Sequence, residues 1–172
     1  MCEGEDRPAT RKARCTHVKR WLLTLTPLLT LAVTATALLG GRPAHAAVPL
    51  AGLQVTVTKS PWCGCCGDYI EILRERGVDV TVIDIEDTAS AKLALGVPPT
   101  TWSCHTTEVD GYAVEGHVPL EAIERLLSER PDITGISLPG MPTGSPGMNG
   151  VKSAPFGVVA FDAEGVHQFG IF

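Results

Sequence analysis

Between residues 53 and 83 the hydrophobic pattern changes from a strand period to a helix period and back again. Apolar and polar side chains alternate in residues 53–58, LQVTVT, and in residues 78–83, VDVTVI, so each segment is predicted to be a β-strand. The apolar residues between them lie three and four positions apart, as on one face of an α-helix that ends at Gly77. They are Cys66, Tyr69, Ile70 and Leu73. A strand, a helix and a strand of this length predict a right-handed crossover between two parallel strands.

The segments that follow predict a small α/β domain. A shorter helix is expected over residues 90–95, a strand over 100–109, its hairpin partner over 112–116, and a helix between Pro119 and Pro131. The resulting order, β-α-β-α-β-β-α, resembles that of a thioredoxin-like domain. In that fold a dithiol motif follows the first strand, and a proline that is commonly cis precedes the third.

Three further features are expected around this order. Pro98 or Pro99 occupies the place of the thioredoxin-like proline, and we expect it to be cis and to lie against the dithiol. Residues 139–150, PGMPTGSPGMNG, contain seven Gly or Pro in twelve positions and are predicted to form a shaped loop without helix or strand. Residues 156–162 and 166–172 flank a short turn and are predicted to close the domain as a β-hairpin.

The N-terminal segment has the pattern of an export signal. Residues 11–20 are basic, residues 21–39 carry no charge, and the small residues of AHA at 44–46 suit a cleavage site. A retained membrane anchor is the alternative, because the uncharged run approaches the roughly 20 residues that span a bilayer. We expect residues 1–46 to be removed as a signal peptide, and residues 47–172 to act as one domain in the periplasm or another exported compartment.

Charge and cysteine content narrow the function of residues 47–172. They hold seven Lys and Arg against sixteen Asp and Glu, so we do not expect binding to nucleic acid or, after signal cleavage, to a membrane. Four of the six cysteines lie here, and in an oxidising compartment the simplest expectation is a disulfide brace. However, Cys63, Cys65 and Cys66 lie within four positions, whereas bracing disulfides close long stretches of chain. This clustering indicates a reactive or metal-binding site and not a structural brace.

Two kinds of chemistry suit a cysteine cluster at the start of the predicted helix. In the first, Cys63 and Cys66 form a CxxC pair that exchanges disulfides, because a helix N-terminus favours the thiolate form. In the second, all three cysteines bind a thiophilic metal ion. The third thiol, Cys65, favours the metal, since it would invite wrong disulfides in an oxidoreductase and could bridge Cu(I) ions. Zinc and an iron–sulfur cluster are alternatives within metal binding.

Further candidate ligands follow along the chain. Cys104 and His105 are adjacent on the predicted strand, so both can reach one site only if the strand ends or bends there. Otherwise Cys104 is a small buried hydrophobe and His105 faces solvent. Met141 and Met148 lie in the Gly- and Pro-rich loop, where little else can pack and a thioether would suit Cu(I). His117 lies between a predicted strand and a helix, and is either a ligand or a structural residue.

Four motifs, in register, carry a resemblance to one known family. They are KSPWCGCCGDY, GVPPTTWSCHT, DGYAVEGHVP and PGMPTGSPGM, and the resemblance covers essentially all of residues 53–172. Together they are similar to the CopG-like copper-resistance family of small exported bacterial proteins, also described as domain of unknown function 411.

The resemblance implies a thioredoxin-like fold whose CxCC motif is turned toward copper, and a periplasmic role in copper tolerance. The sulfur ligands of a Cu(I) centre with one or several ions would be, by position, Cys63, Cys65, Cys66 and Cys104. The family's remaining motif residues are matched by His105, His117, Met141 and Met148. Other copper-resistance proteins would be its partners, and copper redox activity stays open. The rival from another functional class is a thiol–disulfide oxidoreductase that uses Cys63 and Cys66.

Overall fold

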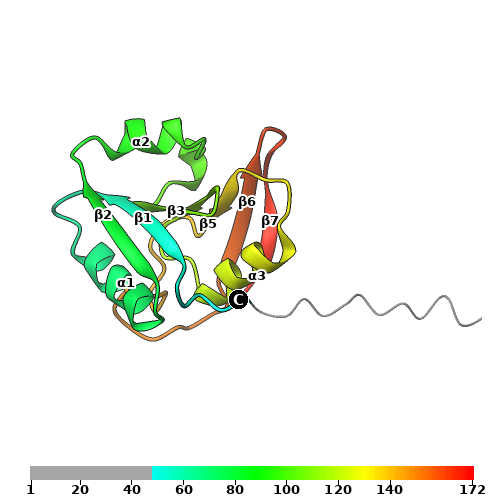
Figure 1. Cartoon of the computed structure of the whole chain (residues 1–172). Helices are drawn as coiled ribbons and strands as arrows, with labels where there is room; N and C mark the ends of the chain where they lie inside the picture. The colour runs from blue at the N-terminus through cyan, green and yellow to red at the C-terminus, as the bar shows by residue number, and fades with distance from the viewer. Residues whose placement is uncertain (1–47) are drawn as a thin grey trace, which may run out of the picture. The chain divides into compact units, whose positions relative to one another are not determined.

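The computed structural model describes residues 48–172, in which seven strands form one mixed sheet in the order β2-β1-β3-β4-β5-β6-β7 (Figure 1). The strands are β1 (Gln54–Lys59), β2 (Asp79–Asp84), β3 (His105–Val109), β4 (Tyr112–Glu115), β5 (Gly135–Ser137), β6 (Gly157–Asp162) and β7 (Gly165–Ile171). The helices are α1 (Gly64–Glu75), α2 (Thr88–Ala94) and α3 (Leu120–Glu129). None of these helices in residues 48–172 is long and apolar enough to cross a bilayer. The predicted signal peptide, residues 1–46, lies outside the described residues.

Helix α1 follows β1 directly and packs one apolar face into the core. The predicted face is buried at every position: Cys66, Tyr69, Ile70 and Leu73. Gly77 adopts φ 79°, a left-handed conformation that glycine tolerates, and turns the chain from α1 into β2. Strands β1 and β2 are parallel, with Val57 opposite Val82. The predicted strand–helix–strand unit with two parallel strands is therefore confirmed.

The prediction of a cis proline is wrong. Residues 48–172 contain no cis peptide bond. Pro98 has φ −66° and ψ 139° and leads into a 3-10 turn, Pro99–Thr101, with proline at its first position. Proline suits the first position of this turn, because its fixed φ matches the turn and no main-chain donor is needed there.

The third strand begins later than predicted and the sheet extends further. Thr101 Oγ1 and Trp102 Nε1 donate hydrogen bonds to main-chain carbonyls at 2.9 and 3.0 Å and hold this stretch in a turn. The strand predicted over residues 100–109 therefore starts only at His105. Strand β5, Gly135–Ser137, was not predicted, because three residues are too few to show an alternating pattern. It pairs parallel with β4 and antiparallel with β6, and so joins the closing hairpin to the thioredoxin-like part.

The other predicted elements are confirmed. Asp110 and Gly111 form the hairpin turn between β3 and β4, with φ 49° and 88°. Strands β6 and β7 form the closing hairpin. Helix α3 buries its apolar face through Leu120, Ile123, Leu126 and Leu127.

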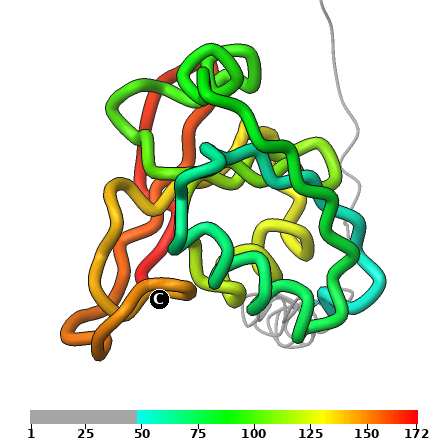
Figure 2. The backbone as a smooth tube through the Cα atoms, turned by 90° about the vertical axis from the view of Figure 1, so that its left-hand side faces the viewer, coloured from blue at the N-terminus to red at the C-terminus, as the bar shows by residue number. Residues whose placement is uncertain are grey.

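The Gly- and Pro-rich loop, residues 139–150, has neither helix nor strand and lies against α1 (Figure 2). The loop comes close to α1 at Gly147, where an added Cβ would come within 2.6 Å of the Tyr69 nitrogen and 3.0 Å of the Cys65 carbonyl oxygen. Gly147 also has φ 76°, so both space and backbone conformation require glycine. The loop is thereby held over the first turns of α1.

We predict that Gly147→Ala lowers the free energy of unfolding by about 1–3 kcal/mol, because the new methyl group must displace the α1 backbone and adopt a strained φ. Urea unfolding measures the change. Gly67→Ala is the matched control, since a Cβ at this helical glycine meets nothing within 4 Å and should add about 0.5–1 kcal/mol. Equal stability of the wild type and Gly147→Ala would show that the loop is not held against α1.

Candidate metal centre

Four cysteine sulfurs meet where α1 begins beside the start of β3. The Sγ atoms of Cys63, Cys65, Cys66 and Cys104 all lie within 4.8 Å of one another. Cys63 and Cys66 form a disulfide, while Cys65 and Cys104 are free thiols. Cys65 Sγ lies 3.6 Å from Cys63 Sγ and 3.9 Å from Cys104 Sγ. The structure thus brings together all four cysteines that the sequence indicated.

The start of α1 exposes these sulfurs differently. Cys63 is the N-cap residue, yet its side chain makes no capping hydrogen bond, so the sulfur is not tied to the helix backbone. Cys66 is fully buried on the apolar face of α1, whereas Cys63 and Cys65 are half-buried. Because several main-chain N–H groups at a helix N-terminus lack partners, negative charge on a sulfur here is stabilised.

Cys104 lies in a bend before β3 and not on the strand itself. The alternation of side chains along a strand therefore does not separate it from His105, and Cys104 Sγ lies 3.3 Å from His105 Nδ1. His105 is fully buried and its ring lies 4.6 Å from that of Tyr69, so the solvent-facing alternative is wrong. His105 Nε2 has no hydrogen-bond partner among the described residues.

His117 completes the site from the connection between β4 and α3. It is fully buried, and its Nε2 lies 3.0 Å from Cys104 Sγ. Its Nδ1 lies 2.6 Å from the carbonyl oxygen of Pro146, in the Gly- and Pro-rich loop. Since a carbonyl can only accept, Nδ1 carries the proton and Nε2 is the acceptor that faces the thiol. Burial lowers the pKa of His117, and the hydrogen bond to Pro146 offsets this in part.

Burial also decides the charge states of the neighbouring groups. It raises the pKa of the Cys104 thiol to about 12, and the nearby Cys65 adds to that rise. Burial lowers the pKa of His105 to about 3, with smaller contributions from His117 and Lys92. At neutral pH Cys104 is a protonated thiol and His105 a neutral imidazole. A metal ion that binds Cys104 as a thiolate must therefore displace its proton.

The two methionines of the Gly- and Pro-rich loop differ in exposure. Met148 follows Gly147, which touches the α1 backbone, and is half-buried. Met141 is 54% exposed. Ser103 Oγ donates a hydrogen bond to the carbonyl of Gly140, which ties the start of the loop to the segment that carries Cys104. The fold therefore places the Gly- and Pro-rich loop next to the four cysteines.

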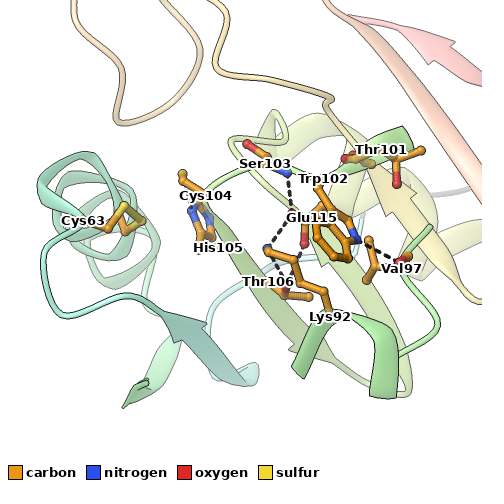
Figure 3. Close-up of polar contacts among 12 residues, drawn as sticks. Cys63, Lys92, Val97, Thr101, Trp102, Ser103, Cys104, His105, Thr106 and Glu115 are labelled. Atoms are coloured by element: carbon orange, nitrogen blue, oxygen red, sulfur yellow. Dashed lines mark hydrogen bonds and ion pairs between the residues drawn. A yellow bond between two sulfur atoms is a disulfide. The ribbon is translucent and has the colours of Figure 1, made fainter. Parts of the chain in front are cut away.

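A buried ion pair beside the site was not found from the sequence. Lys92 Nζ of α2 lies 2.6 Å from Glu115 Oε1 of β4, with both side chains almost fully buried (Figure 3). Glu115 also accepts hydrogen bonds from the Ser103 main-chain nitrogen and from Thr106 Oγ1, each at 2.6 Å. The only signal in the sequence is a carboxylate that ends an otherwise apolar strand, YAVE.

This network holds the segment that carries Cys104. Ser103 and Thr106 lie on either side of Cys104 and His105, and one carboxylate binds both flanks. In Figure 3 the Cys104 side chain points toward the helix that carries the Cys63 disulfide, with Glu115 and Lys92 on the other side of the segment.

We predict that Glu115→Ala lowers the free energy of unfolding by about 3–5 kcal/mol, because the ammonium group of Lys92 stays buried without its partner. The double variant Lys92→Met, Glu115→Leu should lose less, since neither charge is then buried. Denaturant unfolding of the wild type, of Lys92→Met and Glu115→Leu singly, and of the double variant measures the coupling. Additive losses would contradict a buried, coupled pair.

Solved structures of other proteins resemble this chain in sequence and in fold. Two solved structures of copper resistance protein CopG, Form 1 and Form 2, are each 40% identical to this chain, with TM-scores of 0.64 and 0.65. The alignments cover 70% of this chain and 97% and 98% of those structures. This chain belongs to the CopG family.

Two family models match separate parts of this CopG-family chain. The glutaredoxin model matches residues 55–96, which contain most of β1, all of α1 and the CGCC motif, and confirms the thioredoxin-like prediction. The model described as a protein of unknown function, DUF411, matches residues 101–148. That stretch carries the other candidate ligands, namely Cys104, His105, His117, Met141 and Met148. A search among curated proteins found no match.

Proposed function

We propose that this chain is an exported protein that binds Cu(I) at its four-cysteine site and so buffers or detoxifies copper. The observation that carries the proposal is the meeting of four Sγ atoms within 4.8 Å in a chain 40% identical to copper resistance protein CopG. Thiolates are soft ligands that select Cu(I) over harder cations. Four of them at this spacing suit one ion or several bridged ions.

Copper binding through all four cysteines requires the reduced site. Two electrons and two protons must first open the Cys63–Cys66 disulfide, for which a small thiol reductant suffices. Cys65 and Cys104 are already thiols. His117 Nε2 faces Cys104 Sγ and would supply a nitrogen ligand once the thiol proton has left. His105 Nδ1, 3.3 Å from the same sulfur, would supply a second nitrogen ligand.

The Gly- and Pro-rich loop, which carries Met141 and Met148, would add ligands to the bound copper or cover it. Met148 follows Gly147, which approaches the backbone of α1, and its thioether is a ligand suited to Cu(I). Met141 is exposed, so its thioether is accessible to a copper ion in solvent.

Copper redox activity is a further part of the proposal. Reduced Cys63 and Cys66 would each donate one electron to a Cu(II) ion. The products would be the disulfide, two Cu(I) ions and two protons. The disulfide between Cys63 and Cys66 supports this part of the proposal, because it is the oxidised product of that reaction.

Copper per chain tests the binding site directly. The full-length protein with Cys2→Ser and Cys15→Ser is reduced without oxygen and titrated with Cu(I) against a chromophoric chelator. We predict that Cys65→Ser sharply lowers the copper bound per chain, because the central sulfur lies near both Cys63 and Cys104. His167→Ala is the control, since His167 is an exposed residue of β7. Undiminished copper in Cys65→Ser would refute the thiolate site.

Export is tested on the N-terminus of the protein recovered from cells. We expect removal of residues 1–46, so that the exported protein begins at Ala47. Mass spectrometry of the intact periplasmic or secreted protein measures this. A chain that keeps the segment and sediments with membranes would support the anchor instead.

The second candidate function is thiol–disulfide exchange by Cys63 and Cys66. It is favoured by one observation, the disulfide between these residues at the N-terminus of α1. An insulin-reduction assay separates the two functions. A copper-binding protein should reduce insulin no faster than a Cys63→Ser variant, whereas a fast reaction abolished by that substitution would favour the oxidoreductase.

A further inference from the structure

The two free thiols of the site lie close enough to each other to form a second disulfide. Cys65 Sγ and Cys104 Sγ are 3.9 Å apart, and the disulfide sulfur of Cys63 is 3.6 Å from Cys65 Sγ. A disulfide bond is about 2 Å long, so each new bond needs a sulfur shift of about 2 Å. The four sulfurs therefore form a chain of neighbours in which only one pair is bonded.

We propose that the disulfide migrates within the site, from Cys63–Cys66 to Cys65–Cys104. The inference concerns the metal-free protein, and so it stands apart from copper binding. It assigns Cys65 the role of an internal carrier between the two pairs.

Migration takes two thiol–disulfide exchanges. In the first, the Cys65 thiolate attacks Cys63 Sγ, the Cys63–Cys65 bond forms, and the sulfur of Cys66 leaves. In the second, the Cys104 thiolate attacks Cys65 Sγ, the Cys65–Cys104 bond forms, and the sulfur of Cys63 leaves.

The sequence of exchanges balances within the protein. One disulfide and two thiols are present before and after, so no oxidant or reductant is consumed. The protons that leave Cys65 and Cys104 are matched by those taken up at Cys66 and Cys63.

The contacts of Cys104 fit the role of attacking thiol. Cys104 Sγ lies 3.0 Å from His117 Nε2, an acceptor for the thiol hydrogen, and Pro146 holds the other ring nitrogen at 2.6 Å. The same sulfur lies 3.9 Å from Cys65 Sγ, the atom that it attacks. The second exchange proceeds through the small thiolate fraction of Cys104, since burial keeps this thiol protonated at neutral pH.

The position of Cys63 fits the role of leaving group in the second exchange. It is the N-cap residue of α1, and no side chain caps the helix there. The helix N-terminus therefore stabilises negative charge on the departing sulfur, and a stabilised thiolate leaves faster.

The migrated disulfide would change how the site is braced. The Cys63–Cys66 bond links residues of one helical turn, whereas Cys65–Cys104 would join α1 to the segment before β3. Glu115 already holds that segment through hydrogen bonds from Ser103 and Thr106. The backbone that carries Cys104 is therefore fixed beside α1.

Peptide mapping of the metal-free protein tests the migration. The full-length chain with Cys2→Ser and Cys15→Ser, carrying one disulfide, is kept without oxygen in chelator, then alkylated in acid and cleaved with trypsin. Residues 60–74 carry Cys63, Cys65 and Cys66, and residues 93–125 carry Cys104, so migration cross-links two tryptic peptides. No copper is added, and the result does not depend on whether the protein binds it.

We expect the cross-linked pair at a level about tenfold above that in Cys65→Ser, with Cys63 and Cys66 alkylated in the fragment spectra. Cys65→Ser removes the carrier and keeps Cys63–Cys66, and His167→Ala should cross-link like the parent. A cross-link that persists in Cys65→Ser would overturn the role of Cys65. Recovery of Cys65 and Cys104 only as alkylated thiols would overturn the migration itself.

Discussion

The burial of one face of α1 is the interaction on which the site depends. Tyr69, Ile70 and Leu73 are almost fully buried, and burying a large apolar side chain contributes about 1.5–3 kcal/mol. Cys66 lies on the same face one turn earlier, so the packing that fixes the helix also fixes the cysteine motif. Because β1 leads directly into α1, the sulfurs of Cys63 and Cys65 lie at the helix N-terminus, at the edge of the core.

Polar contacts then hold Cys104 and His117 beside this helix. Glu115 binds both flanks of the Cys104 segment, and the Pro146 carbonyl orients His117 toward Cys104 Sγ. Because these polar groups are buried, loss of a hydrogen-bond partner would lower the stability of the fold. The contacts therefore favour one position of Cys104 and His117. The Gly- and Pro-rich loop closes the site through Gly147, whose missing side chain permits contact with the backbone of α1.

The sequence predicted the elements whose hydrophobic period is long enough to be recognised. This holds for α1, with its four buried residues, and for the hairpin turned by Asp110 and Gly111. It failed where contacts distant in sequence override local pattern. The late start of β3 follows from side-chain hydrogen bonds within the preceding turn, and β5 forms because β4 and β6 pair with it. The buried pair of Lys92 and Glu115 was missed because neither residue type indicates burial on its own.

The sequence by itself determined the kind of chemistry available: three cysteines at a helix start, a fourth beside a histidine, and a loop too rich in Gly and Pro for regular structure. Tertiary structure alone decided how these groups meet. Local spacing relates Cys63, Cys65 and Cys66 through one helical turn, but Cys104 lies thirty-nine positions from Cys65 and its distance depends on packing across the sheet. The charge state of Cys104 and His105 was also left to the tertiary structure, since it depends on burial that no single segment creates.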